Sequence, residues 1–338
     1  MAATCRMSTD WTYRGFRALV LENQRVRATI LPEFGAKVHE FVAKNADRDW
    51  MFHHPRTQLR APVYGANIDN WWTGGMDEAI PTAYPCTYRG DELPYMGEAW
   101  SQPWSWRVME DSARRVEVHL SVQTIMSPLR VERWHWLADD EPILHARHRV
   151  TNTGLKPYEI TWGIHPALAI TPSCRIDVPA TRLTVAESVP DWHLGDKGSS
   201  YEWPYVQGKD GVMYDMRQAQ MPAAGWQELH TATPLLEGWA ALTDQARKQG
   251  VALTFTTNPF NTLWVFTIYG GYRDLYACAL EAWTAPSMSL AEAIAEGKAI
   301  SLAPGASLEG ETSLVAYEGL AAVQTVRAGG EVMGPSQV

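Results

Sequence analysis

One short segment of the sequence combines a histidine with a strand that could hold it in place: Gly163-Ile164-His165-Pro166. Residues Tyr158–Ile164 alternate as a strand does, and a proline cannot extend a sheet ladder because it has no backbone N–H. We therefore expect His165 at a strand end, on the rim of a sheet. A lone histidine is usually structural, but an imidazole at a rim can donate a proton near neutral pH, so we take His165 as a candidate general acid.

A second segment, Tyr276-Ala277-Cys278-Ala279-Leu280-Glu281-Ala282-Trp283-Thr284, ends an apolar strand with a carboxylate. Alternation in a strand sends Ala277, Ala279 and Glu281 to one face, with Cys278 and Leu280 on the other. Glu281 is then either a surface charge or a group directed into a space that the alanines leave open. In the second case partial burial would raise its pKa toward the range useful for a general base.

A third group of polar and flat aromatic side chains lies in the irregular stretch between Asn45 and Pro103 and ends at the adjoining Trp104. Gly74 and Gly75 allow a sharp turn or a close approach of the backbone there, and no phosphate-binding glycine pattern is present. So many indoles argue against a plain solvated loop, and we expect a binding role. A hard cation on Asp77, Glu78 or Glu98 stays an open alternative. The group comprises Asn67, Asp69, Asn70, Trp71, Trp72, Asp77, Glu78, Tyr95, Glu98, Trp100 and Trp104.

The remaining histidines show no metal-binding spacing. His145 and His148 are three residues apart on one predicted strand and so face opposite ways. A second irregular stretch, 191–206, is again rich in aromatic residues, and we expect it to border the same cleft as the first.

The elements that must position these groups are mostly strands. Only 289–297 has a helical pattern, with Ser289 as N-cap, Glu292 completing a capping box and Gly297 as the stop. Many strands and few short helices predict an all-β fold, a large antiparallel β-sandwich. We expect a single domain over 1–320 and a flexible tail over 321–338, where small and polar residues dominate. Predicted strands are Phe16–Glu22, Val26–Pro32, Val38–Ala43, Trp104–Glu110, Arg115–Ile125, Leu129–Leu137, Ile143–Asn152, Tyr158–Ile164, Arg175–Val178, Val251–Thr256, Thr262–Tyr269, Leu275–Glu281, Ala299–Leu302 and Glu311–Tyr317.

The overall composition and charge indicate which classes of binding partner this protein can have. A net charge of -9 with scattered basic residues argues against nucleic acid. Four separated cysteines form no CxxC pair, and neither a secretory signal nor a membrane span is apparent, so we expect reduced thiols, a cytoplasmic location and no membrane partner. The 16 Trp and 13 Tyr pair apolar faces with hydrogen-bonding tips, which suits a small carbohydrate as ligand. The sequence is also compatible with a homo-oligomer.

Three quoted motifs, in this order, resemble the aldose 1-epimerase (galactose mutarotase-like) superfamily. Asn152-Thr153-Gly154 leading to Gly163-Ile164-His165-Pro166 is similar to that family's turn and Gly-x-His-Pro motif. Leu280-Glu281-Ala282-Trp283-Thr284 is similar to its Leu-Glu-Pro-x-Thr motif, and 300–305 to the strand and Pro-Gly turn that follow it. The resemblance implies the galactose mutarotase-like sandwich, with His165 as catalytic acid, Glu281 as base and no cofactor.

The early loop departs from the sugar mutarotases. Trp72-Thr73-Gly74-Gly75 stands where a His-Gly-Gly motif is usual, and Ala282 replaces a proline. The Gly-Gly-x-Asp-Glu and Gly-Glu-x-Trp patterns resemble a poorly characterised branch of the superfamily.

Three functions follow as alternatives. The first is an isomerase that interconverts sugar anomers, the second a lyase or hydrolase acting on a keto or acidic glycoside, and the third a non-catalytic carbohydrate-binding protein. The polar surplus of Asp77, Glu78 and Glu98 motivates the second, since mutarotation needs only one acid and one base. For any of them we expect substrate contacts from Arg60, Asn67, Trp72, Asp77, Glu78, Glu98, Trp100, Trp162 and Trp283.

Overall fold

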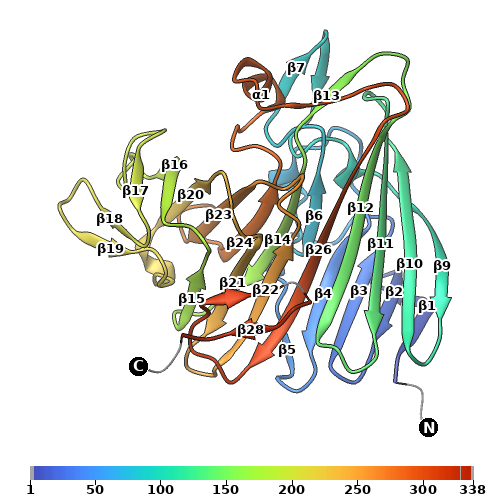
Figure 1. Ribbon diagram of the computed structural model, residues 1–338, viewed down its shortest axis with the longest axis horizontal. Helices are drawn as coiled ribbons and strands as arrows, with labels where there is room; N and C mark the ends of the chain where they lie inside the picture. Colours follow the sequence, from blue (N-terminus) through green and yellow to red (C-terminus); the bar gives the residue numbers. More distant parts are fainter. Residues whose placement is uncertain (1–3, 328, 336–338) are drawn as a thin grey trace.

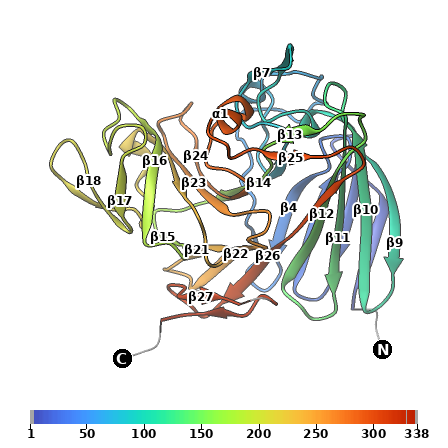
Figure 2. The ribbon, with the colours of Figure 1, turned by 45° about the horizontal axis from the view of Figure 1, so that its top comes forward.

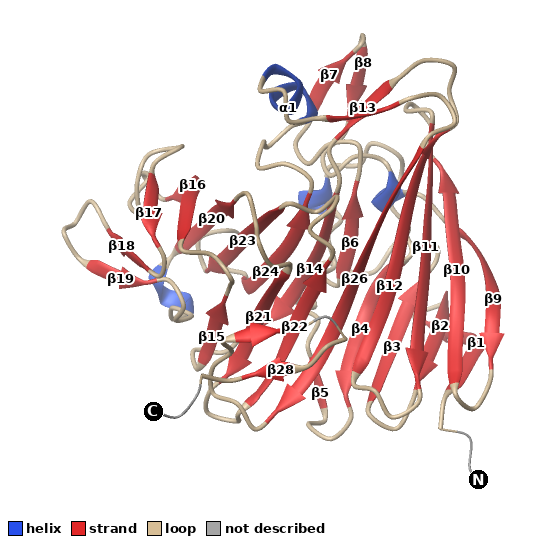
Figure 3. Cartoon of the chain, in the orientation of Figure 1, coloured by secondary structure: helices blue, strands red, loops and turns tan. Residues whose placement is uncertain are grey.

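The computed structural model describes residues 4–327 and 329–335, and two large antiparallel sheets dominate it (Figures 1 and 3). The predicted all-β sandwich is confirmed. The 12-stranded sheet runs in the order β1 (Arg6–Tyr13), β2 (Phe16–Glu22), β3 (Val26–Leu31), β4 (Lys37–Ala43), β6 (Met76–Ala79), β14 (Gly163–Ala169), β24 (Tyr276–Trp283), β23 (Thr262–Tyr269), β20 (Trp226–Ala232), β16 (Arg182–Val189) and β17 (Ser200–Glu202), with β5 (Arg48–Asp49) paired to β4.

The second sheet has eight strands and lies over part of the first. Strands β9 to β12 cover β1 to β4 in Figure 1, and the turned view in Figure 2 shows the same two layers. The main hydrophobic cluster draws on both sheets, from Leu19 and Ile30 to Val118 and Leu314. The order of this sheet is β15 (Cys174–Asp177), β21 (Trp239–Asp244), β22 (Gln249–Phe255), β26 (Ser307–Glu318), β12 (Ile143–Asn152), β11 (Leu129–Ala138), β10 (Arg115–Gln123) and β9 (Ser105–Asp111).

Short helices and two-stranded sheets lie around the two large sheets. The predicted helix is α1 (Leu290–Ala295), and Ser289 caps it by accepting a hydrogen bond from the backbone N–H of Glu292. No helix among the described residues is long and apolar enough to span a bilayer. The two-stranded sheets are β7 (Cys86–Tyr88) with β8 (Asp91–Leu93), β13 (Tyr158–Ile160) with β25 (Ile300–Leu302), β18 (Tyr205–Gln207) with β19 (Met213–Asp215), and β27 (Thr325–Val326) with β28 (Val332–Met333); the 3-10 helices are η1 (Ile68–Asn70), η2 (Ala99–Ser101) and η3 (Pro222–Ala224).

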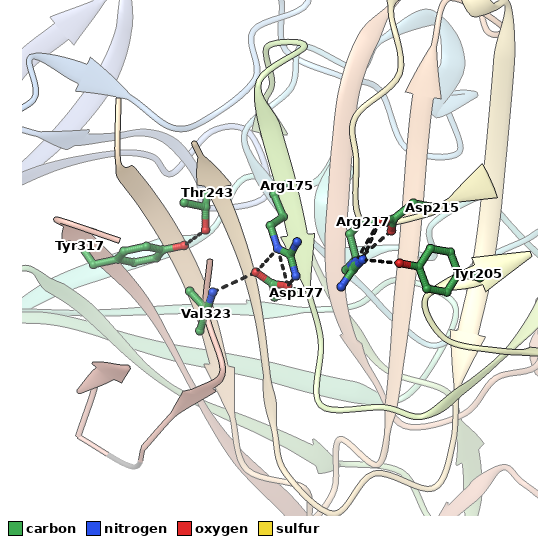
Figure 4. A network of polar contacts seen from close by, with 8 residues as sticks. All are labelled: Arg175, Asp177, Tyr205, Asp215, Arg217, Thr243, Tyr317 and Val323. Carbon is green, nitrogen blue, oxygen red and sulfur yellow. Dashed lines mark hydrogen bonds and ion pairs between the residues drawn. The ribbon is translucent and has the colours of Figure 1, made fainter. Parts of the chain in front are cut away.

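The segment predicted as a flexible tail is folded over its described part. Val323 and Val326 are buried against Ile143 and Trp239 of the eight-stranded sheet. The backbone N–H of Val323 donates a 2.9 Å hydrogen bond to Asp177, in the polar network drawn in Figure 4. Small residues suggested fraying, but the scattered valines supply enough apolar surface to dock the segment. Residues 328 and 336–338 of the predicted tail lie outside the described residues.

Candidate active site

His165 and Glu281 lie side by side on neighbouring strands of the 12-stranded sheet. His165 is the third residue of β14, Glu281 belongs to β24, and the imidazole Nε2 is 3.6 Å from Glu281 Oε1. Only 12% of the histidine side chain and 3% of the glutamate side chain are exposed. The other carboxylate oxygen accepts a 2.7 Å hydrogen bond from the indole N–H of Trp283. Central strands of a large sheet thus hold an imidazole next to a carboxylate.

The strand around His165 differs from the prediction. Strand β14 does not stop at Pro166 but continues to Ala169, and Pro166 still pairs with Met76 of β6. On the other side the ladder to β24 passes from Ile164 directly to Ala167, so His165 and Pro166 have no registered partner there. Because proline has no N–H to donate, it interrupts one ladder while the other holds the strand in the sheet. The interruption falls beside Glu281.

Alternation along β24 is as predicted. Cys278 and Leu280 point into the main core between the sheets, whereas Trp283 belongs to a separate cluster on the opposite face. Glu281 pairs in register with Trp264 of β23, and directly paired residues share a face. The functional candidates therefore lie on the outer face of the sheet, which the segment containing Ile68 and Trp100 covers.

Burial dominates the electrostatics of the pair. It raises the pKa of Glu281, and the neighbouring His165 and the Trp283 N–H offset only part of this effect. No lysine or arginine among the described residues forms an ion pair with Glu281, whose partner is the imidazole alone. A carboxylate in this setting is a stronger proton acceptor than one in water.

A cavity of about 300 Å³ opens on this face, and we call it the His165 cavity. Glu281 lies beside His165 rather than on the cavity wall itself. The Trp72 ring stands edge-on to the imidazole, with centroids 6.2 Å apart. The lining residues are Ile68, Asp69, Trp72, Tyr84, Tyr95, Met96, His165, Glu187, Gln227, Phe266, Ile268 and Tyr272.

Three residues of the cavity lining have an unsatisfied buried polar atom. The indole Nε1 of Trp72, the Nδ1 of His165 and the hydroxyl of Tyr272 have no hydrogen-bond partner among the residues that the structure describes. Buried polar groups in folded proteins are nearly always paired, so three such atoms in the lining of one cavity mark a place for a ligand with hydrogen-bonding groups. Burial raises the pKa of Tyr95 to about 12, so its phenol stays neutral and can donate as well as accept.

Two carboxylates, Asp69 and Glu187, also line the cavity, and its described lining contains no lysine or arginine. Glu187 accepts hydrogen bonds from Tyr84, at 3.2 Å, and from the Gln227 amide. A bulge in β16 shifts the register between Val185 and Glu187. Bulges re-aim side chains beside binding sites, and this one directs Glu187 into the cavity.

Of the substrate contacts predicted from sequence, Trp72 alone lines the cavity. Glu78 is fully buried on the core face of β6, where Arg133 binds it with nitrogen to oxygen distances of 2.9 and 2.6 Å. Trp162, equally buried, donates its indole N–H to the same carboxylate at 2.7 Å. The predicted contacts for Glu78 and Trp162 are therefore corrected: alternation along β6 turns Glu78 away from the cavity, and Trp162, between β13 and β14, packs in the main core.

Glu98 and Trp100 are structural as well. The Glu98 carboxylate is fully buried and accepts hydrogen bonds from the backbone N–H groups of Ile125, Met126 and Ser127, so it anchors the β10–β11 turn. Trp100 is buried in the hydrophobic cluster on the outer face of the 12-stranded sheet, and its indole N–H donates to the backbone carbonyl of Tyr95. Trp283 is buried outside the cavity lining, and its indole N–H donates a hydrogen bond to Glu281.

The remaining predicted contacts lie beside the cavity or at the surface. Asp77 faces the same way as His165, its register partner, and is held by Lys37 Nζ at 2.6 Å. Arg60 is exposed and stacks over Trp71, 3.9 Å from the ring centroid. Asn67 caps η1 by accepting from the Asp69 N–H.

Neither Gly74 nor the histidines His145 and His148 belong to the lining of the His165 cavity. A side chain on Gly74 would lie 1.8 Å from the carbonyl oxygen of Phe52, so this glycine serves backbone packing. His148 points into the core and His145 stacks on Trp136 at the surface, as alternation predicted. Within 4–327 and 329–335, no group of three or more His, Cys, Asp or Glu side chains could hold a metal ion.

Sequence reasoning missed Tyr84, Glu187, Gln227, Phe266 and Tyr272 as lining residues. Glu187 and Gln227 come from β16 and β20, two strands that were not predicted. The bulge breaks the alternation of β16, and polar residues surround Leu229 in β20, so neither strand has a clear period of two.

The fold has relatives of known structure, although no family model matches the chain. A Klebsiella pneumoniae protein provisionally assigned as an aldose 1-epimerase is 15% identical, with a TM-score of 0.74 over 93% of this chain and 83% of that one. A galactose mutarotase-like protein from Clostridium acetobutylicum is 14% identical, with a TM-score of 0.67 over 93% and 99% of the two chains. The galactose mutarotase-like enzyme relative from Lactobacillus acidophilus is 13% identical, with a TM-score of 0.58 over 89% and 97%. The chain therefore has the galactose mutarotase-like fold expected from its motifs.

Proposed function

We propose that this protein interconverts the anomers of an aldose by acid–base catalysis, with Glu281 as the base and His165 as the acid. The observation that carries the proposal is the 3.6 Å approach of His165 Nε2 to Glu281 Oε1 beside a cavity with unsatisfied polar atoms. The fold supports it, because the described relatives include mutarotase-like proteins. Fold alone does not determine a reaction, so the case depends on the chemistry of the pair.

In this mechanism Glu281 removes the proton from the anomeric hydroxyl while His165 protonates the ring oxygen. The C–O bond of the ring breaks, and the sugar opens to its aldehyde. Rotation about one bond and the reverse proton transfers close the ring as the other anomer. The two sugar oxygens are bonded to the same carbon, so the acid and the base that serve them must themselves be close together.

The electrostatics suit these roles. The raised pKa of Glu281 makes its carboxylate a better base, and the buried setting strengthens each proton transfer relative to water. Since Glu281 lies beside His165 rather than on the cavity wall, the mechanism requires the imidazole to move aside enough for Oε1 to contact the sugar. The unpaired N–H of Trp72 and the carboxylates of Asp69 and Glu187 are suitable partners for the remaining hydroxyls.

The polar groups that suggested a lyase or a hydrolase are engaged in contacts within the protein. That alternative was based on polar groups beyond one acid and one base, namely Asp77, Glu78 and Glu98. Glu78 and Glu98 are fully buried and bonded to protein groups, and Asp77 is paired with Lys37. What remains at the cavity is an acid–base pair, neutral hydrogen-bonding groups, and the carboxylates of Asp69 and Glu187, which can accept hydrogen bonds from sugar hydroxyls.

The test is polarimetry on freshly dissolved α-anomers of glucose, galactose and other aldoses. Glu281→Gln and His165→Asn should each lower kcat by about 10²–10⁴-fold, the usual contribution of one positioned acid or base. His145→Asn and Glu309→Gln, both on the other sheet and away from the cavity, serve as matched controls and should keep full activity. Wild-type rates in either site variant would refute the assignment.

A further inference from the structure

The cleft continues beyond the His165 cavity. A second hollow, of about 620 Å³, adjoins it, and we call it the Trp192 hollow. The two spaces share two lining residues, Tyr84 and Glu187, and the Tyr84 hydroxyl donates to Glu187 Oε2 at 3.2 Å. This hydrogen-bonded pair therefore forms the boundary between the two spaces and presents polar atoms at it.

The walls of the Trp192 hollow combine a flat aromatic surface with short polar groups. Trp192 is half-buried and supplies the indole, and Pro85 and Met288 add apolar area. Such a mixture of apolar plane and polar rim matches a sugar ring, whose C–H face is apolar and whose edge carries hydroxyls. The full lining is Tyr84, Pro85, Ala186, Glu187, Ser188, Val189, Asp191, Trp192, Lys197, Met288, Ser289 and Glu292.

The backbone holds Trp192 in an unusual conformation. Asp191 and Trp192 both have left-handed φ values, 55° and 56°. Bulky residues rarely adopt this region, and non-glycine residues kept there cluster at functional sites. The conformation puts the indole on the wall of the hollow.

Charge restricts what the two spaces can bind. Asp69, Glu187 and Asp191 contribute carboxylates, and the lysine of the hollow, Lys197, lies 3.3 Å from Glu292 and is compensated by it. Apart from the proposed acid His165, no cationic side chain among the described lining residues is left to balance a phosphate or a carboxylate on a ligand. Neutral hydroxyls, in contrast, can donate to these carboxylates.

We propose that the cleft binds an uncharged disaccharide, with the reducing ring in the His165 cavity and the second ring against Trp192. This inference rests on the proposed function for its orientation, because the ring that opens must carry the free anomeric centre. The His165 cavity alone, at about 300 Å³, is at the lower end of the range for ligand pockets, about 300–1,000 Å³, which suits one ring there and a second ring next to it.

The test compares maltose, cellobiose and lactose with glucose and galactose, by mutarotation kinetics and by calorimetric titration. At least one disaccharide should have a KM and a Kd about 10-fold lower than its reducing-end monosaccharide. Trp192→Gly should abolish this advantage and leave the monosaccharide constants unchanged. Glycine is chosen because it adopts φ near 56° without strain, so the variant should fold.

Control variants and charged sugars test whether the aromatic surface of Trp192 is what binds the second ring. Trp192→Phe should retain part of the advantage, and Trp11→Ala, at an exposed tryptophan on the edge strand β1, should retain all of it. Glucose 6-phosphate and glucuronic acid should bind more weakly than glucose, and tighter binding of either would overturn the uncharged class.

The two proposals can fail separately. If no sugar is turned over, the acid–base assignment fails, while calorimetry still decides the second ring site through the Trp192→Gly difference. If aldoses are turned over but no disaccharide binds better than its monosaccharide, or Trp192→Gly weakens both equally, the second ring site is refuted and the catalytic proposal stands.

Discussion

Two buried carboxylates, Glu78 and Glu281, lie on the two strands that flank β14, but on opposite faces of the sheet. Burial alone would raise the pKa of both. For Glu78 the Arg133 guanidinium, the His148 ring 3.6 Å away and the hydrogen bond from the Trp162 N–H outweigh burial and lower the pKa to about 2. Glu281 has no such cation, and its pKa is raised.

The difference shows how one sheet separates a structural acid from a reactive one. Arg133 and Trp162 satisfy both carboxylate oxygens of Glu78 inside the core, and the result is a fixed charge. Glu281 is under-compensated, next to an imidazole with a free nitrogen, and its proton affinity is high. Incomplete satisfaction, and not burial by itself, therefore distinguishes Glu281 from Glu78.

The largest effect should come from removing the cation of the core pair. Arg133→Met leaves Glu78 buried and uncompensated, and we expect the free energy of unfolding to fall by about 3–5 kcal/mol in denaturant titrations. The double variant Glu78→Gln/Arg133→Met should recover most of this loss, because the buried charge is then gone. A single variant as stable as the wild type would mean that Glu78 is not held as a charge.

The contribution of the Glu78–Arg133 pair to stability should also appear in the dependence of unfolding on pH. The pKa of Glu78 is lowered, so its stabilising contribution is present above the ordinary glutamate value of 4.5 and is lost as the pH falls toward about 2. Between about pH 5 and pH 2, the wild type should lose on the order of 3 kcal/mol more unfolding free energy than the double variant. Equal slopes for the two proteins would contradict the lowered pKa.

Glu281→Gln should change the stability of the protein in the opposite direction, because it removes a poorly compensated charge. Because the pKa of Glu281 is raised, its contribution to stability is present below pH 4.5 and is lost as the pH rises through the raised value. Gln keeps an oxygen for the Trp283 N–H but carries no charge, so at pH about 8 the variant should be more stable than the wild type by about 0.5–2 kcal/mol. The gain should vanish in acid, and a destabilised variant would count against an under-compensated carboxylate.

The smallest effect concerns the hydrogen bond that partly compensates Glu281. Trp283→Phe removes an N–H that stabilises the carboxylate, so the pKa of Glu281 should rise further. Since the base must be deprotonated, the acid limb of kcat/KM should move to higher pH by about 0.5–1 pH unit. An unshifted limb would show that another group controls it.

Sequence patterns predicted part of this arrangement. Alternation placed Glu281 on the face opposite Cys278 and Leu280, and the capping box located α1, because both signals are local. The partner of Glu78 could not be predicted, because Arg133 lies on the other sheet and only the packing of the layers brings it close. Glu187 was hidden for a different reason: a bulge breaks the alternation that would have identified its strand.

The setting of His165 in the sheet differs from the prediction. The proline after it suggested a strand end, whereas β6 holds the strand in the sheet on one side. A single sequence shows that Pro166 cannot donate a backbone hydrogen bond to a neighbouring strand. It does not show whether the strand on the other side keeps the segment in the sheet.

The indoles of Trp264 and Trp283 are stacked, with ring centroids 4.3 Å apart and planes inclined by 20°. Transition dipoles at such a separation couple, so the pair should give a split circular-dichroism band that isolated tryptophans lack. One member of the pair donates to Glu281, so proton uptake by that carboxylate changes the local field on the chromophore. The site thus carries its own optical reporter, with which its charge state can be followed without a label or a turnover assay.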